Sequence, residues 1–132
     1  MATLLKKLSK TKNDLINVLV IGKGIGGLEE IIEIFQSVFV IASTRPEIKA
    51  RNLIYYENFN FISHLSGISF IIFDRNSLES LNKTIAVWSS CKPLIIIEGE
   101  DIVERPTADI LYHFGYRPWE RNKKYHIWKS KT

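Results

Sequence analysis

Apolar residues in this chain form short continuous runs, and segments with a helical repeat separate them. Runs that are apolar at nearly every position are typical of strands buried on both faces of a sheet. Five runs predict strands, at 16–22, 37–44, 53–59, 68–74 and 92–100. The run at 53–59 contains more polar residues, so we expect it nearer an edge of the sheet.

Three segments repeat apolar residues at helical spacing, and they predict helices over 27–37, 77–91 and 104–115. We expect Ser77 to cap the second of these helices and Gly115 to end the third. The stretch 47–52 is too short to assign, and 61–67 is expected to form a turn or a short helix.

The last part of the chain departs from this alternation. Residues 116–121 and 124–130 are two short extended segments joined by a basic turn, a pattern typical of a hairpin. Alternating strands and helices imply parallel strands joined by right-handed crossovers. The sequence therefore predicts an α/β fold: a three-layer, Rossmann-like sandwich whose mostly parallel sheet of about seven strands ends in an antiparallel hairpin.

Composition changes this picture only at the two ends. Residues 1–12 hold four lysines and no acid, and residues 117–132 hold six basic residues and one acid, Glu120. The stretch between them carries eight basic and thirteen acidic residues. Such ends are usually solvated tails, and the alternative is a contact with nucleic acid or a protein partner. We divide the chain into a basic N-terminal arm, 1–12, and a single domain, 13–132.

Several classes of protein are excluded or disfavoured. The single cysteine, Cys91, excludes an internal disulfide and a zinc cluster of the usual kind, and we expect a buried or half-buried thiol. No two histidines have metal-ligand spacing, so no metal site is expected. No run approaches the roughly 18 apolar residues that a membrane span needs, and no signal peptide is evident. These features predict a soluble, cytoplasmic protein with no membrane contact.

The candidate chemistry begins in the turn after the first strong strand. Gly22, Gly24, Gly26 and Gly27, with Lys23 among them, satisfy both G-x-G-x-G and G-x-G-x-x-G, and an amphipathic helix follows. In open α/β sheets, ligands bind beyond the carboxyl ends of the strands where strand order reverses. A bare backbone turn there predicts a nucleotide site, and the alternative is that the glycines only let helix and strand pack closely.

The end of the second strand offers Ser43, Thr44 and Arg45 in place of an acidic residue. Hydroxyls accept and donate hydrogen bonds to a ribose, although less strongly than a carboxylate accepts them. An arginine beside hydroxyls also suits a 2′-phosphate. This segment therefore keeps NADP open as an alternative cofactor.

Two stretches together resemble a known family. The turn "VLVIGKGIGG" at 18–27 is similar to the glycine loop of spermidine synthases, and "HFGYRPWERNKKYHIWKS" at 113–130 is similar to the terminal hairpin of S-adenosylmethionine-dependent methyltransferases. The resemblance covers about residues 15–130 and implies the methyltransferase fold with S-adenosylmethionine as cofactor. Val20 and Ser43 or Thr44 stand where this family often has acidic residues.

The resemblance also implies roles for single residues. Gly22, Gly24 and Gly26 match the cofactor loop, Glu57 and Asn58 stand where the family contacts adenine, and Asp74 ends a strand near the reacting methyl group. Asp74 is therefore the candidate catalytic residue, and a helix-capping aspartate is the alternative. The predicted cofactor site comprises Gly22, Lys23, Gly24, Gly26, Gly27, Ser43, Thr44, Arg45, Glu57, Asn58 and Asp74.

Three functional hypotheses follow. The first is an S-adenosylmethionine-binding, methyltransferase-like protein of unknown acceptor, with or without activity. The second is an NADP-binding module. The third is a catalytically silent scaffold that binds a protein or nucleic-acid partner, because Tyr116, Trp119 and Tyr125 lie beside Arg117, Arg121, Lys123 and Lys124 and could stack bases. Glu98, Glu100 and Asp101, after the fifth strand, are expected to form a solvated loop, and the alternative is that they bind a cationic group.

Overall fold

The computed structural model describes residues 1–22, 26–58, 67–99 and 101–131. Strands are formed by β1 (Asn17–Ile21), β2 (Ser37–Ile41), β3 (Leu53–Tyr56), β4 (Ile68–Phe73), β5 (Leu94–Glu98), β6 (Tyr116–Arg121) and β7 (Tyr125–Ser130). Helices are formed by α1 (Ala2–Leu8), α2 (Leu28–Ile34), α3 (Leu81–Trp88) and α4 (Arg105–His113), with 3₁₀ turns η1 (Lys12–Leu15), η3 (Arg75–Ser80) and η4 (Ser89–Cys91). The five predicted strands and the terminal hairpin are confirmed.

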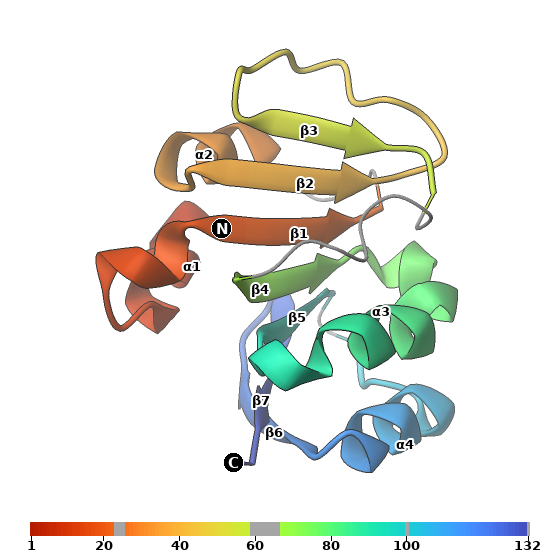
Figure 1. The fold of residues 1–132 in the computed structure, drawn as a ribbon. Helices are drawn as coiled ribbons and strands as arrows, with labels where there is room; N and C mark the ends of the chain where they lie inside the picture. Colours follow the sequence, from red (N-terminus) through yellow and green to blue (C-terminus); the bar gives the residue numbers. More distant parts are fainter. Residues whose placement is uncertain (23–25, 59–66, 100, 132) are drawn as a thin grey trace.

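The strands form one sheet in the order β3-β2-β1-β4-β5-β7-β6 (Figure 1). β1 to β5 are parallel to their neighbours, and β7 runs antiparallel to both β5 and β6. β3 lies at an edge, as its polar composition predicts. The chain leaves β1 for β2 on one side and later returns to β4 on the other side. The strand order therefore reverses between β1 and β4, and the C-terminal ends of these strands mark the switch point.

Both faces of the sheet are buried because the strand residues alternate between two apolar clusters. Leu19 and Ile21 of β1 face the cluster that contains Leu81, Ile85 and Leu111 of α3 and α4. Val18 and Val20 of the same strand face the second cluster, which contains Leu5 and Leu8 of α1 and Ile31 and Phe35 of α2. Figure 1 shows the two helix pairs on opposite sides of the sheet, which confirms the predicted three layers.

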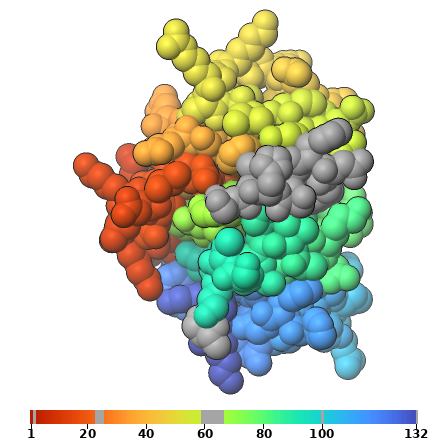
Figure 2. Space-filling model, viewed as in Figure 1, coloured from red at the N-terminus to blue at the C-terminus, as the bar shows by residue number. Residues whose placement is uncertain are grey.

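The basic ends of the chain are not solvated tails. Leu5 and Leu8 of α1 are buried in the core, because lysines occupy only the outer face of this helix. In Figure 2 the red N-terminal residues form one continuous surface with the rest of the molecule. At the other end, Tyr125, Ile127 and Trp128 of β7 are buried in the sheet. The lysines and arginines of both ends are therefore carried by fixed elements.

Two local expectations need comment. Gly115 has a φ of +84° directly after the last turn of α4, which confirms it as the residue that ends this helix. Cys91 is exposed, so the expected buried thiol is wrong. The cause is the tight turn after α3: η4 ends at Cys91, and the next residue, Lys92, has a φ of +51° that turns the chain toward β5.

None of the helices in the described part of the chain combines the length and the apolar character that crossing a membrane requires.

One buried polar contact fixes the hairpin to the parallel part of the sheet. The Tyr116 side chain at the start of β6 is buried, and its hydroxyl donates a hydrogen bond of 2.7 Å to the carbonyl oxygen of Pro93, just before β5. Burial, and secondly the neighbouring Cys91, raises the pKa of the Tyr116 phenol above its ordinary value. The folded state therefore holds this proton more tightly than the unfolded chain does.

We predict that Tyr116→Phe lowers the free energy of unfolding at neutral pH by about 1–2 kcal/mol, because the Pro93 carbonyl loses its donor. In the native protein, stability should be complete below the ordinary tyrosine pKa of about 10 and fall as pH rises above it, since only the unfolded chain then loses the proton. This alkaline loss should be smaller in the variant. Urea unfolding across this pH range measures both effects. Tyr112→Phe, at an exposed tyrosine, is the control, and an equal effect there would contradict the prediction.

Candidate functional site at the switch point of the sheet

The turn after β1 is held tightly against the end of β4. Gly22 has a φ of +103°, and a Cβ atom placed on it would lie 2.5 Å from both the Asp74 Cβ and the Ser77 Oγ. The Gly22 amide donates to the Ile41 carbonyl of β2 (2.8 Å), and the Asp74 amide donates to the Ile21 carbonyl of β1 (2.9 Å). Only glycine fits this position, and the three strand ends are thereby joined at one point.

A cavity of about 410 Å³ opens at this point, and we call it the switch-point cavity. It lies within the size range of small-molecule sites. Its walls come from the ends of β1, β2, β3 and β4 and from η3, and its lining residues are Ile21, Gly22, Ile41, Ala42, Ser43, Glu57, Asn58, Asp74, Ser77, Glu79 and Ser80. The structure therefore brings together five predicted site residues, namely Gly22, Ser43, Glu57, Asn58 and Asp74.

Other predicted residues lie elsewhere. Thr44 and Arg45 are exposed and do not line the switch-point cavity. The Arg45 guanidinium lies over the ring of Tyr55, 5.3 Å from its centroid, and the Tyr55 hydroxyl donates to the Ala42 carbonyl (2.8 Å). This contact keeps the arginine on the outer side of β3. Lys23 and Gly24 lie outside the described residues.

Asp74 has a structural contact of its own. The Asp74 side chain is only 8% exposed, and its Oδ1 accepts a hydrogen bond of 3.1 Å from the Asn76 amide. Asp74 therefore caps η3, and the expected capping role of Ser77 is wrong, because α3 begins only at Leu81 with Ser80 at its N-cap position. η3 begins directly after β4, so Asp74 stands at its N-cap position. Ser77 already lies inside η3, with φ −114° and ψ 20°.

Gly26 and Gly27 line a different cavity, of about 490 Å³, which we call the Gly26 cavity. Its other lining residues are Met1, Glu30, Glu98, Gly99, Lys124 and Tyr125. The Gly26 amide donates to Glu98 Oε2 (3.2 Å), so a side chain at the end of β5 supports the glycine turn. Glu98 is thus not part of a merely solvated loop. Met1 and Tyr125 pack with the α1–α2 cluster, whereas Ile21 and Ile41 of the first cavity belong to the α3–α4 cluster. The two cavities therefore open on opposite faces of the sheet edge.

Arg75 joins the ends of β4 and β5. Its Nε donates to the Glu98 carbonyl (3.0 Å) and its Nη2 donates to the Asp101 carbonyl (2.8 Å). A Cβ atom on Gly99 would lie 2.9 Å from the Arg75 Nε, so glycine is needed there as well. The positive charge next to Asp74 in sequence is therefore used to hold backbone carbonyls.

Charge is distributed unevenly around the site. Three carboxylates, of Glu57, Asp74 and Glu79, line the switch-point cavity, and no lysine or arginine does so among the described residues. The described residues contain no group of three such side chains placed to hold a metal ion. In the Gly26 cavity, burial, followed by Glu98 and then Glu30, raises the pKa of Tyr125 and keeps its phenol neutral. The switch-point cavity thus favours a ligand with positive charge, whereas in the Gly26 cavity Lys124 and the Met1 ammonium offset the carboxylates of Glu30 and Glu98.

Sequence reasoning missed several of these residues. Ser77, Glu79 and Ser80 line the switch-point cavity from η3, although the sequence places them inside a helix. The sequence carried a signal for these three residues, because polar residues that follow closely after a strand ending at the switch point lie at the same edge of the sheet. Glu30 and Tyr125 meet in the Gly26 cavity from segments far apart in the chain, and no local pattern could pair them.

Comparison of the sequence with models of known families gives no match, and no curated protein matches it in sequence. The structure, in contrast, is similar to solved methyltransferases. N-methyltransferase NodS from Bradyrhizobium japonicum WM9 superposes with a TM-score of 0.62 at 12% identity, over 99% of this chain and 94% of that one. NodS in complex with S-adenosyl-L-homocysteine gives the same score and identity, over 86% of that chain.

A second enzyme gives the same result. The 1,6-didemethyltoxoflavin-N1-methyltransferase of Burkholderia thailandensis, solved with its substrate and S-adenosylhomocysteine bound, has a TM-score of 0.61 at 13% identity, over 98% of this chain and 76% of that one. The chain therefore has the fold of S-adenosylmethionine-dependent methyltransferases, and the resemblance drawn from its glycine turn and hairpin is confirmed at the level of the fold.

Gly22 and Gly26, two of the three described glycines of the turn, form a matched pair for mutation. We predict that Gly22→Ala destabilises the protein by roughly 2–4 kcal/mol, because the new Cβ overlaps Asp74 and Ser77 and the positive φ is unfavourable for alanine. Gly26→Ala should change stability by less than about 1 kcal/mol, since its Cβ would meet no atom within 4 Å. Urea unfolding of both variants measures the difference. Equal stabilities would show that the turn at Gly22 is not tightly packed.

Proposed function

We propose that the protein binds S-adenosylmethionine at the C-terminal edge of the sheet and is a methyltransferase. The observation that carries this proposal is the acidic lining of the switch-point cavity, which includes no basic residue among those described. S-adenosylmethionine carries a sulfonium and an ammonium group against one carboxylate, so it is a net cation. A carboxylate-lined cavity at the switch point of this fold suits such a ligand.

The residues present fit the parts of this cofactor. Ser43 follows β2, and its hydroxyl would bind the ribose in place of the carboxylate that is usual in the family. Glu57 and Asn58 follow β3 and would hold the adenosine end by accepting and donating hydrogen bonds. The amino-acid end would cross the C-terminal edge of the strands toward Gly26 and Gly27, where bare backbone, two carboxylates and the Lys124 ammonium are available. Lys23, Gly24, Thr44 and Arg45 stay predictions from the sequence.

When bound, S-adenosylmethionine supplies an electrophilic methyl group that an acceptor can take by direct in-line attack. The protein's own contribution would be to position the two reactants, which is the larger part of catalysis for such a transfer. Rigid strand ends serve this purpose, because Gly22 and Arg75 fix the relative places of β1, β4 and β5. Asp74, held by its cap on η3, would place a negative charge near the sulfonium centre.

The NADP alternative is less well supported. A dinucleotide phosphate carries several negative charges, and the carboxylates of the switch-point cavity would repel them. Arg45, which the sequence offers for a 2′-phosphate, lies over Tyr55 and away from the cavity lining. NADPH therefore serves in the test below as the ligand that should not bind.

Isothermal titration calorimetry should show binding of S-adenosylhomocysteine and of sinefungin, in which an ammonium group replaces the sulfonium centre, and no binding of NADPH. Glu57→Gln should weaken the binding of both S-adenosylhomocysteine and sinefungin by roughly tenfold, the usual effect of a lost charged hydrogen bond. The matched control is Glu47→Gln, at another exposed glutamate that does not line the cavity. Tighter binding of NADPH than of either analogue would overturn the proposal.

A second variant tests the place of Asp74. Asparagine also caps helices well, so Asp74→Asn should leave thermal stability nearly unchanged. The loss of charge should weaken the binding of sinefungin by roughly tenfold. It should weaken the binding of S-adenosylhomocysteine, whose sulfur is neutral, by less than about threefold. Calorimetry with the two ligands gives the ratio. An equal effect on both would mean that Asp74 acts only as a cap.

A further inference from the structure

Large apolar side chains gather on one part of the surface. Ile102 (78% exposed), Tyr112 (44%) and Trp119 (49%) are three of the five exposed large hydrophobic residues in the described part of the chain. All three line one groove of about 390 Å³ between α4 and the β6–β7 hairpin, which we call the aromatic groove. Its other lining residues are Val103, Ala108, Pro118, Glu120, Arg121, His126, Ile127 and Trp128. Exposed rings clustered in this way mark a surface that contacts a ligand.

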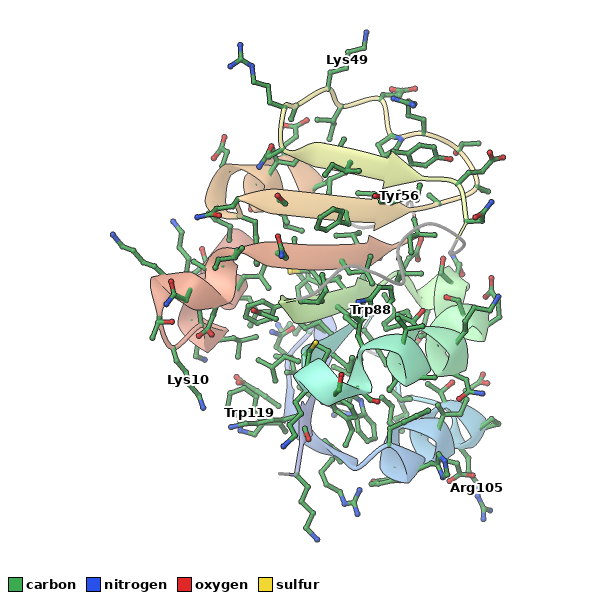
Figure 3. All side chains as sticks on the ribbon, viewed as in Figure 1. Lys10, Lys49, Tyr56, Trp88, Arg105 and Trp119 are labelled. Carbon is green, nitrogen blue, oxygen red and sulfur yellow. The ribbon has the colours of Figure 1, made fainter. Side chains whose placement is uncertain are left out.

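The position of Trp119 has a local cause. In the ladder between β6 and β7, Pro118 pairs with Trp128 and Glu120 pairs with Ile127, so the register shifts across Trp119. Such a bulge re-aims the side chain of the extra residue. Trp119 is thereby directed outward, at the opposite end of the molecule from Lys49 (Figure 3).

Positive charge accompanies the rings. The Lys129 Nζ lies 4.9 Å from the centroid of Trp119, and the Arg117 guanidinium carbon lies 5.0 Å from the centroid of Tyr112. Arg121 lines the groove itself. Each exposed ring therefore has a cation beside it, in the arrangement that lets a ring stack on a base while the cation meets a phosphate.

Two of the four acidic side chains near the groove are matched by bases. Glu120 lies 3.4 Å from the Lys7 ammonium, and Asp109 on α4 lies 3.9 Å from the Arg105 guanidinium. Glu104 and Asp101 are also exposed near this end of the molecule. Against them, residues 117–131 carry six basic side chains and one acid. Of these six, Arg121 lines the groove and Arg117 and Lys129 lie beside its exposed rings, so the hairpin supplies the positive charge that a polyanion requires.

We propose that the aromatic groove binds a single-stranded nucleic acid. Trp119 and Tyr112 stack on bases, and Arg117, Arg121 and Lys129 contact the phosphates. An apolar protein segment would use the rings but not the cations beside them, and a membrane surface would not need a groove between a helix and a hairpin. This inference does not rest on the proposed cofactor site, because binding is measured without any cofactor.

The test uses the full chain and a fluorescently labelled single strand of about ten nucleotides, either uridine or deoxythymidine, with anisotropy as the readout. Trp119→Ala should weaken binding by roughly 5- to 100-fold, the effect of losing one stacked base, and Trp119→Phe should restore most of it. The matched control is Ile54→Ala, at another exposed apolar residue, 38% exposed, on the opposite edge strand β3.

Salt dependence tests the cations separately. Between about 50 and 200 mM salt, Arg121→Ala should reduce the slope of log affinity against log salt by roughly 0.7, and Arg51→Ala, at an exposed arginine before β3, should not change it. RNA and DNA strands that bind alike identify a general single-strand site, and a preference for RNA identifies a site that reads the 2′-hydroxyl.

Three results would overturn the inference. The first is no binding of either strand at low salt. The second is an equal loss of binding in Trp119→Ala and Ile54→Ala. The third is a dimer, seen by sedimentation velocity without nucleic acid, that Trp119→Ala dissociates, because the groove would then be an interface between two copies of the chain.

Discussion

The close approach of β1 and β4 at their C-terminal ends is the constraint on which the site depends. Gly22 can lie against Asp74 and Ser77 only because it has no side chain, and its backbone continues the hydrogen bonding from β1 to β2 at the same residue. This contact joins the ends of the two strands, and the switch-point cavity opens beside it. The geometry of a glycine, and not its flexibility, thus places the candidate site.

The second organising feature is the separation of charge. Carboxylates line the switch-point cavity at the edge of the parallel strands, and the basic residues of the C-terminal region lie on the hairpin and the turn within it. Long-range attraction would therefore guide a cationic cofactor and a polyanion to different surfaces of the same small molecule. The N-terminal helix contributes to this arrangement, because Lys7 of α1 balances Glu120 on the hairpin.

Much of the fold could be predicted because its signals are local. The β1, β2, β4 and β5 strands are nearly uninterrupted apolar runs, and the alternation in the terminal segment marks the hairpin. The part of the site that could be predicted is the part formed by residues directly after the parallel strands. Gly22, Ser43, Glu57 and Asp74 meet because these strands end at one edge of the sheet. What failed depends on single side chains. A ring at Tyr55 holds Arg45 away from the cavity, and a carboxylate at Asp74 takes the cap that a helical pattern assigns to Ser77.

The edge strand β6 explains why its aromatic residues need a separate account. An exposed edge invites another strand to pair with it, and proteins prevent this with proline, bulges and charge. β6 has all three: Pro118 has no amide hydrogen to donate, the register shifts at Trp119, and Arg117 and Arg121 flank the shift. Pairing with a further strand is thus disfavoured by the backbone. The exposure of Trp119 therefore points to contacts made by side chains. Side chains hold stacked bases, whereas main-chain hydrogen bonds hold an added strand.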